Sequence, residues 1–335
     1  MLFMEFGISY RFFNIKIIDI SKLLKYLFLL SHHFIYKKCI FDKTIFIEMK
    51  ISGFTFIRNG HSLDYPFVES IKSILPIVDE LVVVVGNSDD DTRETVENLD
   101  KSKIKIIDTV WDESIRVGGA ILAQQTNVAL DHITGDWGLY IQGDEVLHEK
   151  YQAPLVKSMQ THLNNAEVEG LLFDYKHFYG SYDYVGDSRN WYRKEIRVVR
   201  NDPKIRSYRD AQGFRKVDNT KLKVKPANAS MYHYGWVRDP QAQIRKNLSF
   251  QKLWHDDAWV AENVSANSFD YNLLESLVRF TDTHPAVMAE RLQRMQWEFN
   301  YDPSKKVLSR KEKFSRIVES LTGWRIGEYK NYKLI

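Results

Sequence analysis

The sequence predicts an α/β fold with a mostly parallel central sheet, flanking helices and a helical C-terminal region. The first observation is that the short apolar runs Ile51–Ile57 and 81–85 have the length and composition of buried strands. The second is that segments with helical periodicity lie between such runs. Strands that alternate with helices form parallel sheets with helices on both faces.

Each element of this first half can be placed from its own residues. Proline fits the first turn of a helix, so Pro66 marks the start of a helix whose apolar residues continue to Val78. Further strands are expected at residues 104–107 and 137–141, and further helices at 92–99 and 118–133.

Beyond residue 150 the alternation fades. Strands are expected at 171–179 and 195–200, and helices at 241–254 and 285–299. A last apolar stripe, flanked by basic residues, contains Phe314, Ile317, Val318 and Leu321. Such a stripe is expected to pack on its own domain, and the alternative is contact with anionic lipid.

Composition limits the classes of function. The 335 residues suffice for one large domain or for a domain with an appendage. The formal charge of +3, from 47 basic and 44 acidic residues, gives no reason to expect a nucleic-acid partner. Cys39 is the only cysteine, which excludes an intramolecular disulfide and fits a reducing compartment. Aromatic residues make up 13% of the chain and offer flat surfaces on which sugars can stack.

Residues 1–48 differ from the rest, because their apolar stretches show no clear period and none is long enough to span a membrane. We expect this segment to be a poorly ordered extension or to precede the native start, with membrane-surface anchoring as the alternative. The remainder divides into 49–240, with halves 49–150 and 151–240, and a helical region, 241–335.

Three polar loops follow predicted strands, at the sheet edge where ligands of parallel sheets bind. In the loop 142–145, Gly143 lets a ligand approach the backbone, and Asp144 with Glu145 can hold Mg²⁺ or Mn²⁺. The alternative is a turn whose acids cap the next helix.

The two other loops carry residues suited to a nucleotide. Asn87 and Asp90 can bond a ribose or base, although a helix cap explains Asp90 equally well. Arg58 and Asn59 lie where a base or diphosphate can bind, with a simple turn as the alternative for Asn59. Arg116 precedes a glycine pair at a helix start, a place suited to anions, or is a solvated surface residue.

In order and spacing, these segments resemble the family 2 glycosyltransferases of the GT-A, Rossmann-like fold. The matching stretches are residues 54–59, 78–92, 127–130 and 135–145. The chain departs from the family at two places: Val85 replaces an acid that contacts the base, and Gln142 replaces the first acid of the metal motif.

The resemblance implies an enzyme that moves a sugar from a nucleotide-sugar donor to a hydroxyl of a glycan, lipid-linked or other acceptor, with inversion and a divalent cation. The implied metal ligands are Asp144, Glu145 and His233. The implied donor contacts are Arg58, Asn59, Asn87, Asp90, Arg116, Asn127, Gln142 and Trp236. The implied location is the cytoplasm, with peripheral contact at the inner face of the membrane left open.

In the resembling family the catalytic base is an Asp or Glu, because a carboxylate can take the proton of the attacking hydroxyl. Asp210 lies about where that base falls. The alternative is a loop acid paired with Arg206 or Arg209, and Asp183 and Asp187 are weaker candidates for the base. Structural roles are likewise the alternatives for His233 and Trp236.

Other functions remain as alternatives. A glycosyltransferase-like scaffold that binds a sugar or nucleotide without turnover would fit the substitutions at Val85 and Gln142. A nucleotidyltransferase has a similar core, but its glycine-rich basic loop is poorly matched by residues 58–61. A nicotinamide-dependent dehydrogenase is least supported, because no G-x-G-x-x-G follows a strand.

Overall fold

The computed structural model describes residues 48–264, 269, 271, 276–299, 301–302 and 310–335. Residues Met49–Ile335 form one compact unit. The predictions made for residues 1–48 lie outside the described residues, apart from Glu48, and the division at residue 240 stays a prediction.

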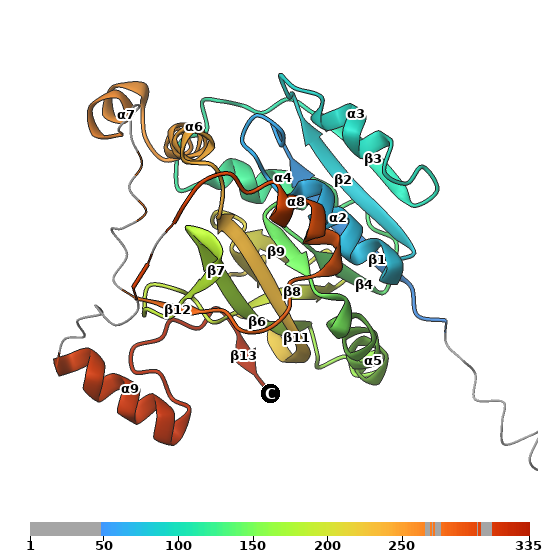
Figure 1. The fold of residues 1–335 in the computed structure, drawn as a ribbon. Coiled ribbons are helices and arrows are strands. Elements are labelled where there is room, and N and C mark those ends of the chain that lie inside the picture. Colours follow the sequence, from blue (N-terminus) through green and yellow to red (C-terminus); the bar gives the residue numbers. More distant parts are fainter. Residues whose placement is uncertain (1–47, 265–268, 270, 272–275, 300, 303–309) are drawn as a thin grey trace, which may run out of the picture. The chain divides into compact units, whose positions relative to one another are not determined.

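The first four strands lie side by side in parallel, in the order β3-β2-β1-β4 (Figure 1). They are β1 (Ile51–Ile57), β2 (Glu80–Gly86), β3 (Ile104–Thr109) and β4 (Trp137–Tyr140). The helices between them are α2 (Phe67–Ile74), η1 (Leu75–Ile77, a 3-10 helix), α3 (Thr92–Glu97) and α4 (Ala120–Leu130). This alternation confirms the predicted α/β fold class, in which helical crossovers link parallel strands.

Strand β2 shows why the sheet is covered on both faces. Leu81 and the four valines that follow it are at most 2% exposed. Because successive side chains of a strand point to opposite faces, Val83 and Val85 join one hydrophobic core while Val82 and Val84 join the other. An unbroken apolar run is therefore the composition that this position in the sheet requires.

Beyond β4 the sheet becomes mixed. Strand β8 (Lys194–Arg200) pairs antiparallel with β4 and with β6 (Gly170–Tyr179), and β11 (Lys223–Trp236) pairs parallel with β6. Further strands of this sheet are β5 (Glu145–Leu147), β7 (Ser181–Gly186), β12 (Leu277–Arg279) and β13 (Lys333–Leu334). Strands β9 (Ile205–Tyr208) and β10 (Gly213–Lys216) form a separate two-stranded hairpin.

The helix predicted over residues 285–299 is shorter in the structure and ends at Gln293. Beyond that point the indole of Trp297 donates a hydrogen bond to the carbonyl of Gly180 at 2.7 Å, and the ring of Phe299 packs against the same glycine. These contacts hold the chain on the β6–β7 turn. The helical segments of the second half are η2 (Glu149–Tyr151), α5 (Gln152–His162), α6 (Pro240–Gln251), α7 (Asp257–Asn263), η4 (Ala286–Met288), α8 (Ala289–Gln293) and α9 (Arg310–Thr322).

Helix α9 corrects the expectation that its apolar stripe packs on its own domain. Three of the stripe's four residues, Phe314, Ile317 and Leu321, are more than half exposed, and the fourth, Val318, is partly buried. The opposite, polar side of the helix makes the contacts with the rest of the unit, through Arg316 and Glu319. Periodicity identified the stripe but could not say which side of the helix would be buried.

Strand β11 positions His233 beside the loop that follows β4. It pairs antiparallel with β5, which places His233 opposite Glu145. The backbone N–H of Tyr234 then donates to the carbonyl of Asp144 at 2.7 Å. Asp144 and His233, which are 89 positions apart in the chain, are thereby fixed next to each other.

Candidate functional site

A cleft of about 980 Å³ opens where the loops after β1 and β4 meet helix α6 and the β9–β10 turn. Predicted site residues that line it are Arg58, Asn59, Arg116, Gln142, Asp144, Asp210, His233 and Trp236. Predicted site residues outside its lining are Asn87, Asp90, Asn127 and Glu145. The fold therefore gathers residues of both predicted halves around one cavity.

Asn87 and Asp90 hold loops together outside the cleft. The side-chain oxygen of Asn87 accepts a hydrogen bond from the backbone N–H of Trp111 at 3.1 Å. Asp90 accepts hydrogen bonds from the backbone N–H groups of Ser62 at 2.8 Å and Thr92 at 3.1 Å. Burial raises the pKa of Asp90, but these bonds and that of the Thr92 hydroxyl outweigh burial and lower it. Asp90 thus accepts from the first N–H of α3 (Thr92–Glu97) from the position before the N-cap residue, Asp91.

Asn127 and Glu145 are likewise engaged within the protein. Asn127 accepts a hydrogen bond from the backbone N–H of Ser207 at 2.9 Å, which ties α4 to β9. Glu145 is fully buried and forms an ion pair with the fully buried Arg197 at 2.8 Å. The hydroxyl of Tyr175 also donates to Glu145 at 2.7 Å. The two acids of the motif thus have different environments, one in the cleft and one in the core.

Arg58 and Asn59 lie in the cleft wall. Asn59 has a φ of 53° in the left-handed region, and its N–H donates to the hydroxyl of Ser88 at 3.0 Å, so it forms the turn after β1. The guanidinium of Arg58 is 2.9 Å from Glu113 and 5.4 Å from the ring centre of Trp111. A cation beside a flat indole gives this wall both charge and a stacking surface.

Asp144 is a buried carboxylate with the cations Lys246 and Arg238 near it. The ammonium of Lys246 lies 3.3 Å from its Oδ2 and donates to the carbonyl of Gly235 at 2.8 Å. Burial raises the pKa of Asp144, but Lys246, His233 and Arg238 outweigh burial and lower it to about 2. Burial, followed by the charge of Arg238, lowers the pKa of Lys246 to about 7. Asp144 is therefore ionised at neutral pH.

A chain of hydrogen bonds through His177 sets the tautomer of His233. It decides whether the nitrogen that faces Asp144 carries a proton or a lone pair. Burial holds the pKa of His177 well below its ordinary value, so this imidazole is neutral. Its Nε2 lies 2.7 Å from the carbonyl of Tyr192, which can only accept, so the proton of His177 is on Nε2. His177 Nδ1 then accepts from His233 Nδ1 at 3.0 Å. Because burial also lowers the pKa of His233, its Nε2 carries a lone pair.

That lone pair and the carboxylate converge. Nε2 of His233 lies 3.7 Å from Oδ2 of Asp144, and neither atom can donate to the other. A cation near two such acceptors is favourable, and Lys246 supplies one from the side of Asp144. A neutral imidazole held by a partner on its other nitrogen is also the usual form of a metal-ligating histidine.

These residues fit a divalent cation that a ligand helps to hold. Mg²⁺ in phosphate sites is commonly bound through one or two carboxylates plus substrate phosphates. Asp144 provides one such carboxylate and His233 a neighbouring imidazole, whereas Glu145 is engaged by Arg197. Within the described part of the chain, no three or more His, Cys, Asp or Glu residues gather around one point.

Asp210 lines the same cleft from the β9–β10 turn. Its neighbours Arg209 and Ala211 have φ angles of 56° and 61°, in a region that non-glycine residues rarely adopt. The side-chain amide of Gln142 holds this turn by donating to the carbonyl of Ala211 at 3.0 Å. Burial raises the pKa of Asp210 above its ordinary value. The glutamine that departs from the family motif thus positions the predicted base.

The start of α4 lies against Asp210. A Cβ built on Gly119 would be 2.8 Å from the Cβ of Asp210 and 2.6 Å from the ring of Trp254. Gly119 also has a φ of 66°, which glycine adopts without strain. Gly119 therefore allows the start of α4 to pack closely against Asp210 and Trp254.

Arg116 and Trp236 complete the set of predicted residues in the lining. Arg116 forms an ion pair with Asp257 at 2.9 Å. The ring centre of Trp236 is 5.8 Å from the ammonium of Lys246 and 5.9 Å from the ring centre of Tyr179. Trp236 thus contributes an aromatic edge to the cleft beside its central cation. The alternative acids Asp183 and Asp187 are not in the lining.

Lys246 and Trp111 line the cleft but are not among the site residues that the sequence predicts. Lys246 falls in the helix predicted over residues 241–254, where Gln243, Lys246 and Phe250 have helical spacing and all line the cleft. The sequence signal that points to Lys246 is a charged residue on the side of this helix that meets the domain. Trp111 also lines the cleft, and its buried indole N–H has no partner among the described residues.

Glu195, behind the cleft, makes stability depend on pH. It is 3% exposed, and burial raises its pKa from the ordinary 4.5 to about 7. The folded state holds this proton more tightly than the unfolded state, so stability is full below the unfolded pKa and falls as pH rises through the folded pKa.

We therefore expect Glu195→Gln to raise the free energy of unfolding by about 3 kcal/mol near pH 8 and by little near pH 5. The amide remains neutral where the buried carboxylate must ionise. Urea denaturation at both pH values measures this difference. An equal gain at both values would show that the effect does not come from ionisation.

No protein-family model and no curated protein sequence matches this chain. Similar solved structures include S. aureus TarS 1-349 in complex with UDP, at 21% identity over 39% of this chain and 36% of that one, with a TM-score of 0.28. A second is glucosyl-3-phosphoglycerate synthase from Mycobacterium tuberculosis in complex with Mn²⁺, UDP and phosphoglyceric acid, at 23% identity, 39% and 44% coverage and a TM-score of 0.26.

A third is the mannosyltransferase PcManGT from Pyrobaculum calidifontis in complex with GDP-Man and Mn²⁺. It shows 18% identity over 38% of this chain and 35% of that one, with a TM-score of 0.29. In all three matches the chain spans less than half of the length of the similar protein. Among the described residues, no helix has the length and apolar character needed to cross a membrane.

Proposed function

We propose that the protein is a family 2 type glycosyltransferase of the cytoplasm, which moves a sugar from a nucleotide-sugar donor to a hydroxyl of a glycan or lipid-linked acceptor. The observation that carries this proposal is the convergence of Asp144 Oδ2 and His233 Nε2, 3.7 Å apart, in a cleft that Asp210 also lines. The cleft thus brings together Asp144 and His233, which would bind a diphosphate through a cation, and Asp210, a carboxylate that can accept a proton.

Asp144 and His233 would hold a divalent cation, which neutralises the charge that develops on a leaving diphosphate. The chain also brings its own cation to this point. Lys246 lies beside Asp144, where its ammonium can donate to a phosphate oxygen. Arg58, farther along the wall, offers charge to the nucleotide, and the ring of Trp111 beside it offers a stacking surface.

Asp210 would act as the base for the acceptor hydroxyl. Attack on the anomeric carbon forms the new glycosidic bond, breaks the bond to the diphosphate and passes the hydroxyl proton to the Asp210 carboxylate. A base in this role must be deprotonated, and its raised pKa brings its proton affinity closer to that of neutral solution. Gln142 keeps the carboxylate in place through Ala211.

The proposal is tested by calorimetry with UDP and GDP, with and without Mn²⁺, followed by an assay of donor hydrolysis and sugar transfer. We expect one nucleotide to bind more tightly with Mn²⁺, and transfer from the matching donor. Binding without hydrolysis or transfer would instead identify a sugar- or nucleotide-binding scaffold. Absence of nucleotide binding under all conditions would refute both functions.

Asp210→Asn is expected to lower kcat by about 10²–10⁴-fold, while the donor's affinity measured by calorimetry changes little. The amide has the same shape but cannot take a proton. The kcat of the natural protein should fall as pH drops through the raised pKa of Asp210, and the variant should lose this dependence. Asp218→Asn, at an exposed turn, serves as the matched control. Unchanged kcat in D210N would assign the base to another group.

A further inference from the structure

Helix α9 carries an apolar face that nothing in the described structure covers. Phe314 is 63% exposed, Ile317 56% and Leu321 80%, and Trp324, just after the helix, is 55% exposed. At 3.6 residues per turn, the three helical side chains fall within an arc of about 60°. An exposed stripe of this kind is uncommon on a soluble surface unless it binds something.

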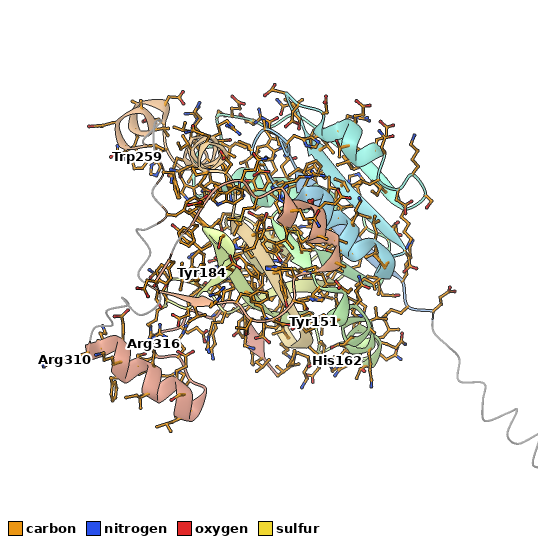
Figure 2. All side chains as sticks on the ribbon, viewed as in Figure 1. Tyr151, His162, Tyr184, Trp259, Arg310 and Arg316 are labelled. Atoms are coloured by element: carbon orange, nitrogen blue, oxygen red, sulfur yellow. The ribbon has the colours of Figure 1, made fainter. Side chains whose placement is uncertain are left out.

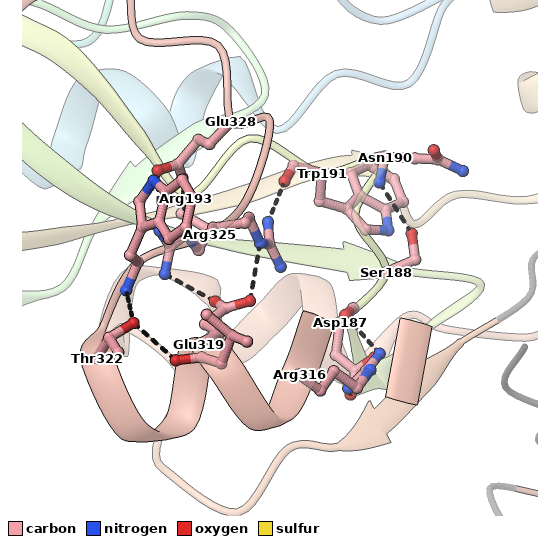
Figure 3. Close-up of polar contacts among 12 residues, drawn as sticks. Asp187, Ser188, Asn190, Trp191, Arg193, Arg316, Glu319, Thr322, Arg325 and Glu328 are labelled. Atoms are coloured by element: carbon pink, nitrogen blue, oxygen red, sulfur yellow. Dashed lines mark hydrogen bonds and ion pairs between the residues drawn. The ribbon is translucent and has the colours of Figure 1, made fainter. Parts of the chain in front are cut away.

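Ion pairs on the other side of the helix fix this orientation (Figure 3). Arg316 donates to both carboxylate oxygens of Asp187, at 2.7 and 2.9 Å. Glu319 accepts from Arg193 at 2.8 Å and from Arg325 at 3.2 Å. The charged side of α9 therefore contacts the rest of the compact unit. Figure 2 shows Arg316 on the side of α9 toward that unit, and Arg310 at the start of the helix.

Basic residues border the apolar face. Arg310, Lys311 and Lys313 are all exposed at the N-terminal end of the helix. By the same helical rotation, Lys311 and Lys313 lie on opposite flanks of the stripe, about 60° and 100° from Phe314. Lysines in this position can extend their ammonium groups beside the stripe while their alkyl stems cover it.

We propose that α9, together with Trp324, docks the protein on an anionic lipid surface. An aromatic and aliphatic stripe with basic flanks is the pattern of helices that lie in the interface of a bilayer. The positive border attracts acidic headgroups, each lysine or arginine contributing to binding, and it repels a second copy of the same face. This inference goes beyond the proposed sugar transfer and does not depend on it.

The full chain is tested by flotation with vesicles of phosphatidylcholine alone and with about one third phosphatidylglycerol. We expect binding to the anionic vesicles, weakened by salt and by the neutral composition. Ile317→Glu combined with Leu321→Glu should weaken binding by about tenfold or more, because it places two charges in the apolar face. Lys311→Glu combined with Lys313→Glu should weaken it on anionic vesicles only.

The matched control is Val217→Glu, at an apolar residue just after β10 that is 68% exposed. It should bind vesicles as the natural chain does. Melting temperatures check that each variant is folded, since all the changes are at exposed positions. Absent binding of the natural chain, or binding that the apolar-face variant retains, would overturn the proposal. A second result would also overturn it: no vesicle binding, together with light scattering in which the wild-type chain is a dimer and the Ile317→Glu, Leu321→Glu variant a monomer.

Discussion

Replacing Asp144 by asparagine is expected to abolish detectable sugar transfer, a loss of about 10³-fold or more in kcat/KM. The amide keeps the shape of the side chain but removes the negative charge that His233 and Lys246 surround. Without that charge, a divalent cation loses its carboxylate ligand, and Lys246 loses its partner. Initial rates with the donor identified by calorimetry measure the effect.

A second readout separates a site defect from a folding defect. Titration of the protein with Mn²⁺, with free Mn²⁺ followed by its electron paramagnetic resonance signal, should show weakened binding in D144N and in His233→Ala. The melting temperature should fall by several degrees, because the lowering of the Asp144 pKa from 3.8 to about 2 corresponds to a loss of about 2–2.5 kcal/mol in the variant. Glu149→Gln, an exposed acid nearby in sequence, is the matched control. If D144N kept the activity and the Mn²⁺ affinity of the wild-type protein, Asp144 would have no part in the mechanism.

Breaking the buried ion pair behind the motif should have the largest effect on stability. Arg197→Ala is expected to lower the free energy of unfolding by about 3–5 kcal/mol, because it leaves the buried charge of Glu145 without its partner. The guanidinium also donates to the carbonyl of Gln212 at 2.8 Å and lies 5.2 Å from the ring centre of Tyr175. Urea denaturation measures the change.

The matched control is Arg93→Ala, which removes exposed ion pairs with Glu97 and Asp108 and should cost less than about 1 kcal/mol. Replacing both partners, as Glu145→Leu with Arg197→Met, should recover much of the lost stability, since no unpaired charge remains. A loss in the double variant equal to that in R197A would show that packing, rather than an uncompensated charge, sets the cost.

The sequence by itself determined the α/β class and most of its first half. The valines of β2 predict a strand buried on both faces, and β1 has the bounds that its apolar run indicates. Local periodicity suffices there, because a parallel sheet covered by helices imposes the same pattern on each strand. The order of polar loops along the chain likewise placed Asp144 and Arg58 at one cleft.

Only the tertiary structure decided what each of these residues does. Asp144 and Glu145 are neighbours in the chain, yet one faces Lys246 in the cleft and the other pairs with Arg197 in the core. The burial of a side chain and the charge of its partner depend on strands and helices that are remote in sequence. The direction in which α9 turns its apolar face was set in the same way, by Arg316 and its ion pair, because periodicity defines a face but not its neighbour.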